Sequence, residues 1–174
     1  MNKREKIKTA FLYGVFICYI FLLIKILFLS RIPYLEHRSI NLIPFYSIME
    51  YISGRTANIK AFAFGNVVGN IVIFTPLGTY WSLFKNDKRV ITNLLFIFIV
   101  SLFVEIIQGF LGIGASDIDD IILNCLGGLI GILGYKFLLF ILRDEKKVHT
   151  AITILSAIGL PCILYYLFMV RMRF

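Results

Sequence analysis

Charged side chains are scarce in this chain. Asp, Glu, Lys and Arg together make up 16% of its 174 residues, against about 25% in an average soluble domain. Hydrophobic residues reach 59%, and the mean hydropathy is +0.87. This composition excludes a disordered chain, which is poor in apolar residues, and an ordinary soluble domain. We therefore expect a protein that is solvated in part by a lipid bilayer.

Cysteines and histidines are also few. Three cysteines, Cys18, Cys125 and Cys162, lie in apolar runs without a C-x-x-C spacing, so we expect them to pack as small hydrophobic side chains. The two histidines, His37 and His149, fall in separate loops, and no histidine metal cluster is expected. The net charge of +8 does not indicate nucleic acid, because the basic residues lie between apolar runs rather than in one patch.

Five apolar runs are long enough to cross about 30 Å of hydrocarbon, which takes about 20 helical residues. They are Thr9–Leu29, Ala61–Phe84, Val90–Leu111, Ile121–Leu142 and Thr150–Val170. Each span must satisfy its own backbone in lipid, and none shows the alternation of barrel strands, so we expect helices. The predicted fold is an all-α integral membrane bundle of five transmembrane helices, forming a single domain over residues 1–174.

The basic residues predict the orientation in the membrane. With a cytoplasmic N-terminus, the inner segments carry ten Lys and Arg residues and the outer segments six. The inner segments are 1–8, 85–89 and 143–149, and the outer ones are 30–60, 112–120 and 171–174. Since cytoplasmic flanks are the more basic ones, we expect the N-terminus in the cytoplasm and the C-terminus outside.

The long outer loop contains apolar residues at helical spacing: Phe45, Ile48, Met49 and Ile52. Pro44 suits the first turn of a helix and Gly54 its end. The pattern predicts a short amphipathic helix in the outer membrane interface. A plain lid over the bundle, without a ligand of its own, fits the same pattern.

Polar residues inside the spans are the best guide to function, because each is costly in lipid. They share helix faces in the second, third and fourth spans: Asn66 and Asn70; Ser101, Glu105 and Gln108; Asp117, Asp120 and Asn124. Asp119 lies beside the last group and is counted with it as a candidate pocket residue. In the predicted topology all three groups reach the outer end of the bundle. Glu105, at mid-helix, must be protonated, paired with a cation or in contact with water.

Two plainer explanations apply to the same residues. Ser116-x-x-Asp119 is a capping-box pattern with Asp in place of Glu, and acidic residues in a first turn complement the helix dipole. Asparagine and glutamine can also serve as interhelical contacts without a ligand. Deeper in the fourth span, Gly127, Gly131 and Gly134 predict a close approach to a neighbouring helix.

Four segments together resemble the VanZ-like family, bacterial membrane proteins associated with resistance to the glycopeptide teicoplanin. They are Asn41–Phe45 (NLIPF), Gly69–Gly78 (GNIVIFTPLG), Ser101–Gln108 (SLFVEIIQ) and Asp117–Gly131 (DIDDIILNCLGGLIG). The family often has an arginine shortly before the acidic stretch, where this chain reads Gly114-Ala-Ser116. Arg31, Arg38 or Arg55 would then have to supply any anion contact, beside the loop residues Asn41 and Pro44. The resemblance implies a role in the cell envelope of a bacterium.

Three functions fit these residues. The favoured one is non-catalytic: an outer pocket binds a membrane lipid or lipid-linked cell-wall precursor and so lowers susceptibility to teicoplanin-type drugs, with no cofactor and no nucleic acid. The alternative is a metal-dependent enzyme acting on a lipid-linked substrate, in which Glu105, Asp119 and Asp120 hold Mg²⁺ or Ca²⁺ or serve as general acid and base. Ion transport ranks last, since the inner halves of the spans are nearly all apolar.

Overall fold

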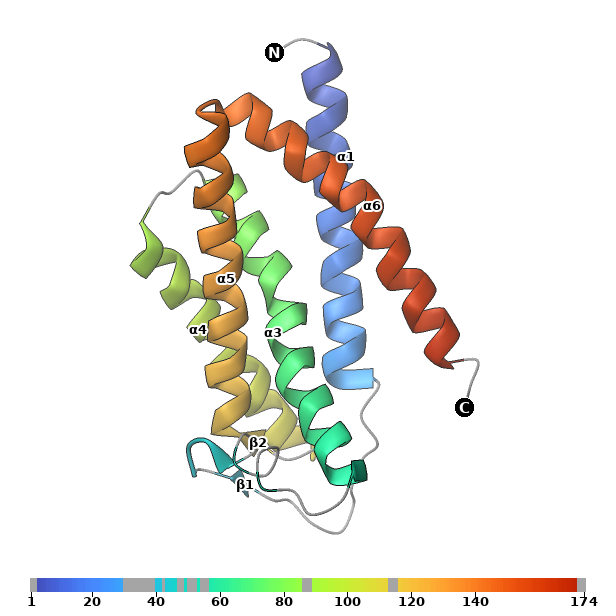
Figure 1. The fold of residues 1–174 in the computed structure, drawn as a ribbon, viewed down its shortest axis with the longest axis vertical. Helices are drawn as coiled ribbons and strands as arrows, with labels where there is room; N and C mark the ends of the chain where they lie inside the picture. The colour runs from blue at the N-terminus through green and yellow to red at the C-terminus, as the bar shows by residue number, and fades with distance from the viewer. Residues whose placement is uncertain are drawn as a thin grey trace. The chain divides into compact units, whose positions relative to one another are not determined.

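The computed structural model describes residues 3–29, 40–41, 43–46, 49, 53, 57–85, 89–112 and 116–171. Long helices dominate it (Figure 1). In chain order the elements are α1 (Lys3–Ile24), the π-helical turn η1 (Lys25–Leu29), β1 (Ile40–Asn41), α3 (Ala57–Lys85), α4 (Val90–Leu111), β2 (Ser116–Asp117), α5 (Ile118–Leu142) and α6 (Glu145–Arg171). The predicted all-α class is therefore confirmed.

Four helical segments of the described chain are long and apolar enough to cross a membrane. They are Glu5–Leu29, Phe64–Lys85, Val90–Leu111 and Ile118–Leu142, and they correspond to the first four predicted spans. The fifth predicted span lies within α6, which is helical but is not among these four. A count of five transmembrane helices therefore stays a prediction.

Large apolar side chains cover the surface, and several polar ones are buried, unlike in a soluble protein. Large apolar residues point outward, with Ile91 83% and Phe110 80% exposed, whereas Ser101, Gln108 and Asp119 are 0% exposed. In water this arrangement would be unstable, because exposed apolar area costs free energy. In lipid it is the expected one, since polar groups there must find partners inside the protein.

The chain forms two compact units, and each is described here by itself. The terminal unit comprises Met1–Lys25 and Leu138–Phe174, and the central unit comprises Ile26–Phe137. In the terminal unit, α1 packs against α6. Their N-terminal turns are joined by a hydrogen bond from Lys8 Nζ to Thr150 Oγ1 (3.0 Å) and an ion pair between Lys146 and Glu5 (2.9 Å).

The central unit is built on a close approach of α3 and α5. A Cβ atom added at Gly127 or Gly131 of α5 would collide with the carbonyl oxygen of Ile71 or Thr75 of α3, and one at Gly78 would collide with Gly128. The Thr79 hydroxyl also donates to the Gly131 carbonyl (3.2 Å). Small residues thus let the two backbones touch, as small-residue stripes do in membrane bundles.

Two of the three glycines predicted at a helix contact, Gly127 and Gly131, do lie there. The expectation for Gly134 was wrong, because no atom lies within 4 Å of the Cβ position at that residue. Gly128, one residue from the predicted stripe, instead faces the Ile97 side chain of α4. The contact of α5 with α3 therefore ends one turn earlier than the spacing suggested.

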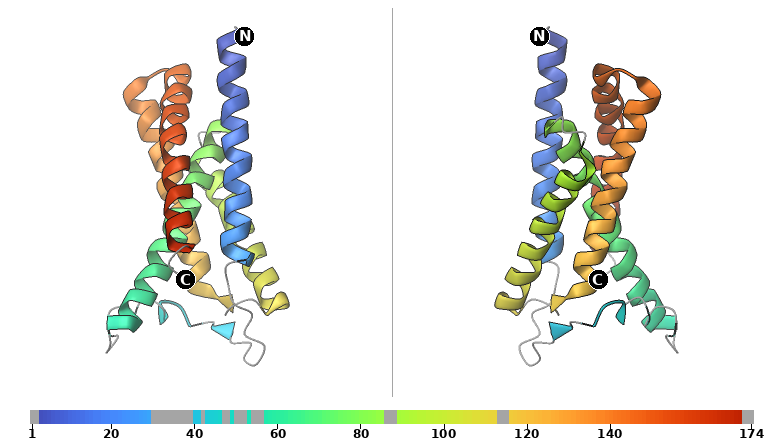
Figure 2. Two further views of the ribbon diagram at one scale, coloured as in Figure 1. Left: turned by 90° about the vertical axis from the view of Figure 1, so that its right-hand side faces the viewer. Right: turned by 90° about the vertical axis from the view of Figure 1, so that its left-hand side faces the viewer.

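At one end of the central unit, the last turn of α4 and the first turn of α5 lie close to β1 and β2 (Figures 1 and 2). The two strands pair in parallel, with Ile40 opposite Ser116 and Asn41 opposite Asp117. Neither strand was expected, since two residues show no periodicity. The predicted interfacial helix lies only partly within the described residues. There the Met49 N–H donates to the Phe45 carbonyl (2.8 Å) with helical spacing, and both side chains are exposed.

We expect Gly131→Ala to lower the thermal stability of the protein in mild detergent. The added methyl group must displace the α3 backbone at Thr75, and overpacking of this kind costs about 1–3 kcal/mol. Gly134→Ala is the matched control. It should leave stability unchanged or raise it by about 0.5–1 kcal/mol, because alanine is the better helix former. Equal melting temperatures for the two variants would contradict the close contact.

Candidate functional site

The polar residues predicted in three spans come together at this end of the central unit. Six of them are buried there, each no more than 5% exposed: Asn70, Glu105, Gln108, Asp119, Asp120 and Asn124. Asn66 and Asp117 are half-buried. We call these eight residues the polar cluster. Their convergence, which was inferred from helix faces, has its basis in the packing of α3, α4 and α5.

Asp120 links α5 to α3. Its Oδ1 atom accepts hydrogen bonds from the side-chain amides of Asn66 (3.0 Å) and Asn70 (2.6 Å). The two asparagines lie one turn apart, so both amides reach the same oxygen. A carboxylate accepting two such bonds is well stabilised against the cost of burial.

Glu105 fixes the loop between α4 and α5. Its Oε2 atom accepts the backbone N–H of Asp117 (3.1 Å), a residue of strand β2. Because β2 pairs with β1, this carboxylate also positions the segment that carries Asn41. Glu105 is 4% exposed, so a buried carboxylate within the span holds the backbone of the segment between α4 and α5.

Asp117 caps α5, since its Oδ1 accepts the N–H of Asp119 (3.0 Å). The predicted capping box, with Ser116 as the cap and Asp119 returning to it, was therefore wrong in its residues. The Asp119 carboxylate instead accepts the N–H of Phe45, far away in the sequence. Phe45 adopts a positive φ of 66°, which is unusual for a residue with a side chain. Asp119 thus ties the segment between α1 and α3 to the start of α5.

Asn124 of α5 and Gln108 of α4 complete the polar cluster. The Asn124 amide donates to Ser101 Oγ (3.0 Å), and the Gln108 amide donates to the Leu27 carbonyl in η1 (2.9 Å). The other amide atoms, Asn124 Oδ1 and Gln108 Oε1, are buried without a hydrogen-bond partner among the described residues. A buried acceptor left without a donor costs about 1–3 kcal/mol.

The predicted loop contacts are only partly described. Asn41 lies in β1 beside Asp117, and Pro44 lies in an exposed turn next to Phe45. Arg31, together with Arg38 and Arg55, lies outside the described residues.

The metal alternative receives no support from the geometry. Among the described residues, no three acidic, cysteine or histidine side chains are grouped as a metal site requires. Glu105, Asp119 and Asp120 instead accept hydrogen bonds from three different segments: Asp117 N–H, Phe45 N–H and the α3 asparagines.

A second polar contact was missed at the opposite end of the central unit. The buried Asn93 amide of α4 donates to Ser82 Oγ of α3 (3.3 Å). Beside it, the Trp81 and Phe96 rings stack at 3.5 Å, with Lys85 Nζ 5.7 Å from the Trp81 ring centroid. Asn93 in an apolar helix was the signal that could have identified this contact.

Comparison with known proteins agrees with the motifs. The family model described as VanZ/LLP1 matches residues 16–141. The chain belongs to this family. It is 30% identical over 135 residues to protein VanZ of Enterococcus faecium, covering 75% of this chain and 73% of that protein. No solved structure matches. Family membership and the four apolar helices together make this VanZ/LLP1 chain a multi-pass membrane protein.

We expect Glu105→Gln to be more stable than Glu105→Ala. Glutamine retains an oxygen for the Asp117 N–H, whereas alanine leaves that donor without this partner, at a cost of about 1–3 kcal/mol. Thermal unfolding of the purified protein in detergent measures the difference. EDTA should leave the melting temperature of the wild-type protein unchanged. A large loss with EDTA, reversed by one divalent ion and absent in Glu105→Gln, would instead indicate a metal held by this carboxylate.

Proposed function

We propose that this protein acts in the bacterial cell envelope, where it lowers susceptibility to teicoplanin-type glycopeptides. In this proposal the polar cluster binds a polar group of an outer-leaflet lipid or lipid-linked cell-wall component. No covalent chemistry is involved. Membership of the VanZ/LLP1 family supports the cellular role, and the buried polar residues support the location of the binding site.

The observation that carries the proposal is the pair of buried oxygens, Gln108 Oε1 and Asn124 Oδ1, with no partner among the described residues. A helix contact that served packing alone would gain stability by replacing such groups with apolar side chains. Each oxygen is an acceptor only, so the complementary ligand presents hydroxyl or amide donors. Sugar hydroxyls and peptide N–H groups of cell-wall precursors, and glycerol hydroxyls of lipids, have this chemistry.

The proposal requires the polar cluster to face outward. The N-terminus is then cytoplasmic, the C-terminus is outside, and α6 is the fifth span. The excess of Lys and Arg in segments 1–8, 85–89 and 143–149 supports this orientation. The resulting location is the bacterial cytoplasmic membrane.

Orientation can be tested with single cysteines introduced after Cys18, Cys125 and Cys162 have been replaced. We expect a cysteine at Glu50 or Ser116 to react with an impermeant maleimide added to whole cells. A cysteine at Asp87 should react only after the cells are permeabilised. Labelling of Asp87 from outside, with Ser116 silent, would reverse the topology and place the polar cluster on the cytoplasmic side.

The role of the polar cluster can be tested with Asp120→Asn. This change keeps the size of the side chain and one acceptor oxygen for Asn66 and Asn70, but it removes the charge and adds a donor. We expect the variant to accumulate in the membrane while teicoplanin protection is abolished, as measured by the minimal inhibitory concentration for an expressing host.

Ser82→Ala is the control for Asp120→Asn, since it removes a buried polar contact at the opposite end of the central unit. It should retain protection. If Asp120→Asn fails to accumulate, or keeps full protection, the carboxylate serves the fold alone and the proposed site is wrong.

A further inference from the structure

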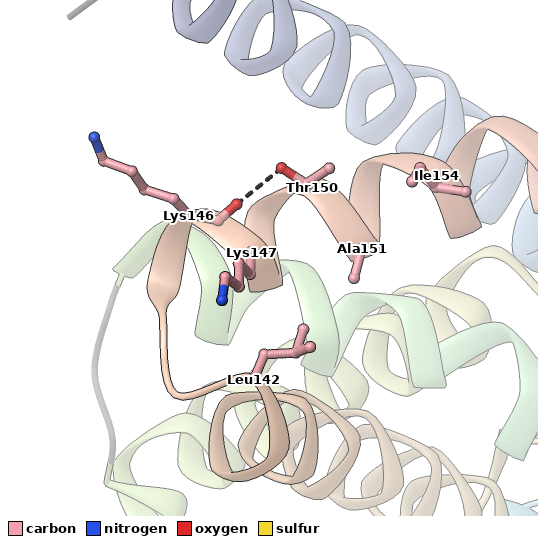
Figure 3. Close-up of a pocket in the computed structure, with 6 residues that line it drawn as sticks. All are labelled: Leu142, Lys146, Lys147, Thr150, Ala151 and Ile154. Carbon is pink, nitrogen blue, oxygen red and sulfur yellow. Dashed lines mark hydrogen bonds between the residues drawn. The ribbon is translucent and has the colours of Figure 1, made fainter.

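The terminal unit contains a cavity that the proposed function does not use. It has a volume of about 410 Å³ and lies between the end of α5 and the first turns of α6. Its lining consists of Leu142, Lys146, Lys147, Thr150, Ala151 and Ile154 (Figure 3). The lining surface is almost entirely apolar, because Lys146 and Lys147 contribute mainly their aliphatic stems, while the two lysine side chains are exposed to solvent.

The two lysines in the lining differ in their surroundings. Lys146 forms an ion pair with Glu5 (2.9 Å), which raises the pKa of its ammonium group. In Figure 3 it points away from the cavity, whereas Lys147 lies on the side of Leu142. Within the described part of the chain, no ion pair of Lys147 is found. Lys147 is thus the ammonium group available to a ligand in the cavity.

A second ammonium group lies at the same rim. Lys8 of α1 donates to Thr150 Oγ1 (3.0 Å), and Thr150 is part of the lining. Its charge is felt by His149, whose pKa is lowered first by burial and then by Lys8. The acidic residues of this region are Glu5, Asp144 and Glu145, against seven basic ones in segments 1–8 and 143–149. The rim therefore has a net positive charge.

The geometry points to a binding site for one anionic phospholipid in this cavity. Lys147 and Lys8 bind the phosphate, and the first part of an acyl chain packs against Leu142, Ala151 and Ile154. A basic pocket beside membrane helices, at the level of the headgroups, is the arrangement that recognises anionic lipids. In the proposed orientation the lipid belongs to the cytoplasmic leaflet, so this site is separate from the outer polar cluster.

The test uses the full chain in mild nonionic detergent, with equal amounts of phosphatidylglycerol and phosphatidylcholine added and bound lipid counted by native mass spectrometry. We expect one phosphatidylglycerol to be bound in preference to phosphatidylcholine. Lys147→Gln should weaken that binding about fivefold, the usual effect of one basic side chain at a membrane surface. The variant should fold normally, because Lys147 is exposed.

Two further variants make the result specific. Lys6→Gln also removes one positive charge, from the N-terminal part of α1, but Lys6 is not part of the lining. This variant should bind phosphatidylglycerol as the wild type does. Ala151→Leu fills the apolar side without changing charge and should also weaken binding. Equal binding of both lipids, an unaffected Lys147→Gln, or an equal loss in Lys6→Gln would each overturn the proposal. Equal binding of both lipids would indicate unselective lipid contact. An equal loss in Lys6→Gln would indicate a diffuse effect of charge.

Discussion

The hydrogen bonds of Asp120 to Asn66 and Asn70 are the contact on which the polar cluster depends. In a bilayer, apolar burial does not drive helices together, because lipid tails are as apolar as leucine. A buried carboxylate, by contrast, has a large cost unless donors surround it. The contact therefore fixes which faces of α3 and α5 meet. With those faces set, Asp119 at the start of α5 lies where it can accept the Phe45 N–H, and Asp117 of strand β2 lies where Glu105 can accept its N–H.

Close backbone contact below the polar cluster supports the same register. Gly127 and Gly131 meet Ile71 and Thr75 in the same order along both helices, so α3 and α5 run parallel. A slip of one turn would place a side chain against backbone and separate Asp120 from its asparagines. Dispersion contacts and polar contacts thus favour the same register of α3 and α5. In a membrane bundle these contacts replace the hydrophobic effect as the driving force for helix packing.

Helix positions and the shared faces of polar residues followed from the sequence, because the period of a helix is regular and each polar residue in a span is conspicuous. Contacts between distant segments did not follow. The bond from Phe45 N–H to Asp119 joins residues 74 apart, and no local pattern encodes it. The capping pattern was ambiguous because Ser116 and Asp117 are both good N-cap residues. In the structure Ser116 pairs with β1, and Asp117 caps the helix. Gly134 shows that helical spacing identifies a face but not where a contact ends.

The residues of the polar cluster differ in how completely their polar atoms are hydrogen-bonded. Asp117, Asp119, Asp120 and Glu105 each accept hydrogen bonds that hold backbone or a neighbouring helix, so each has a role in the fold. Gln108 and Asn124 are different, since each uses its amide N–H within the fold and leaves an oxygen without a partner among the described residues. A leucine at either site would remove that cost. In the proposed function, a ligand donor would satisfy these two oxygens, which have no partner among the described residues.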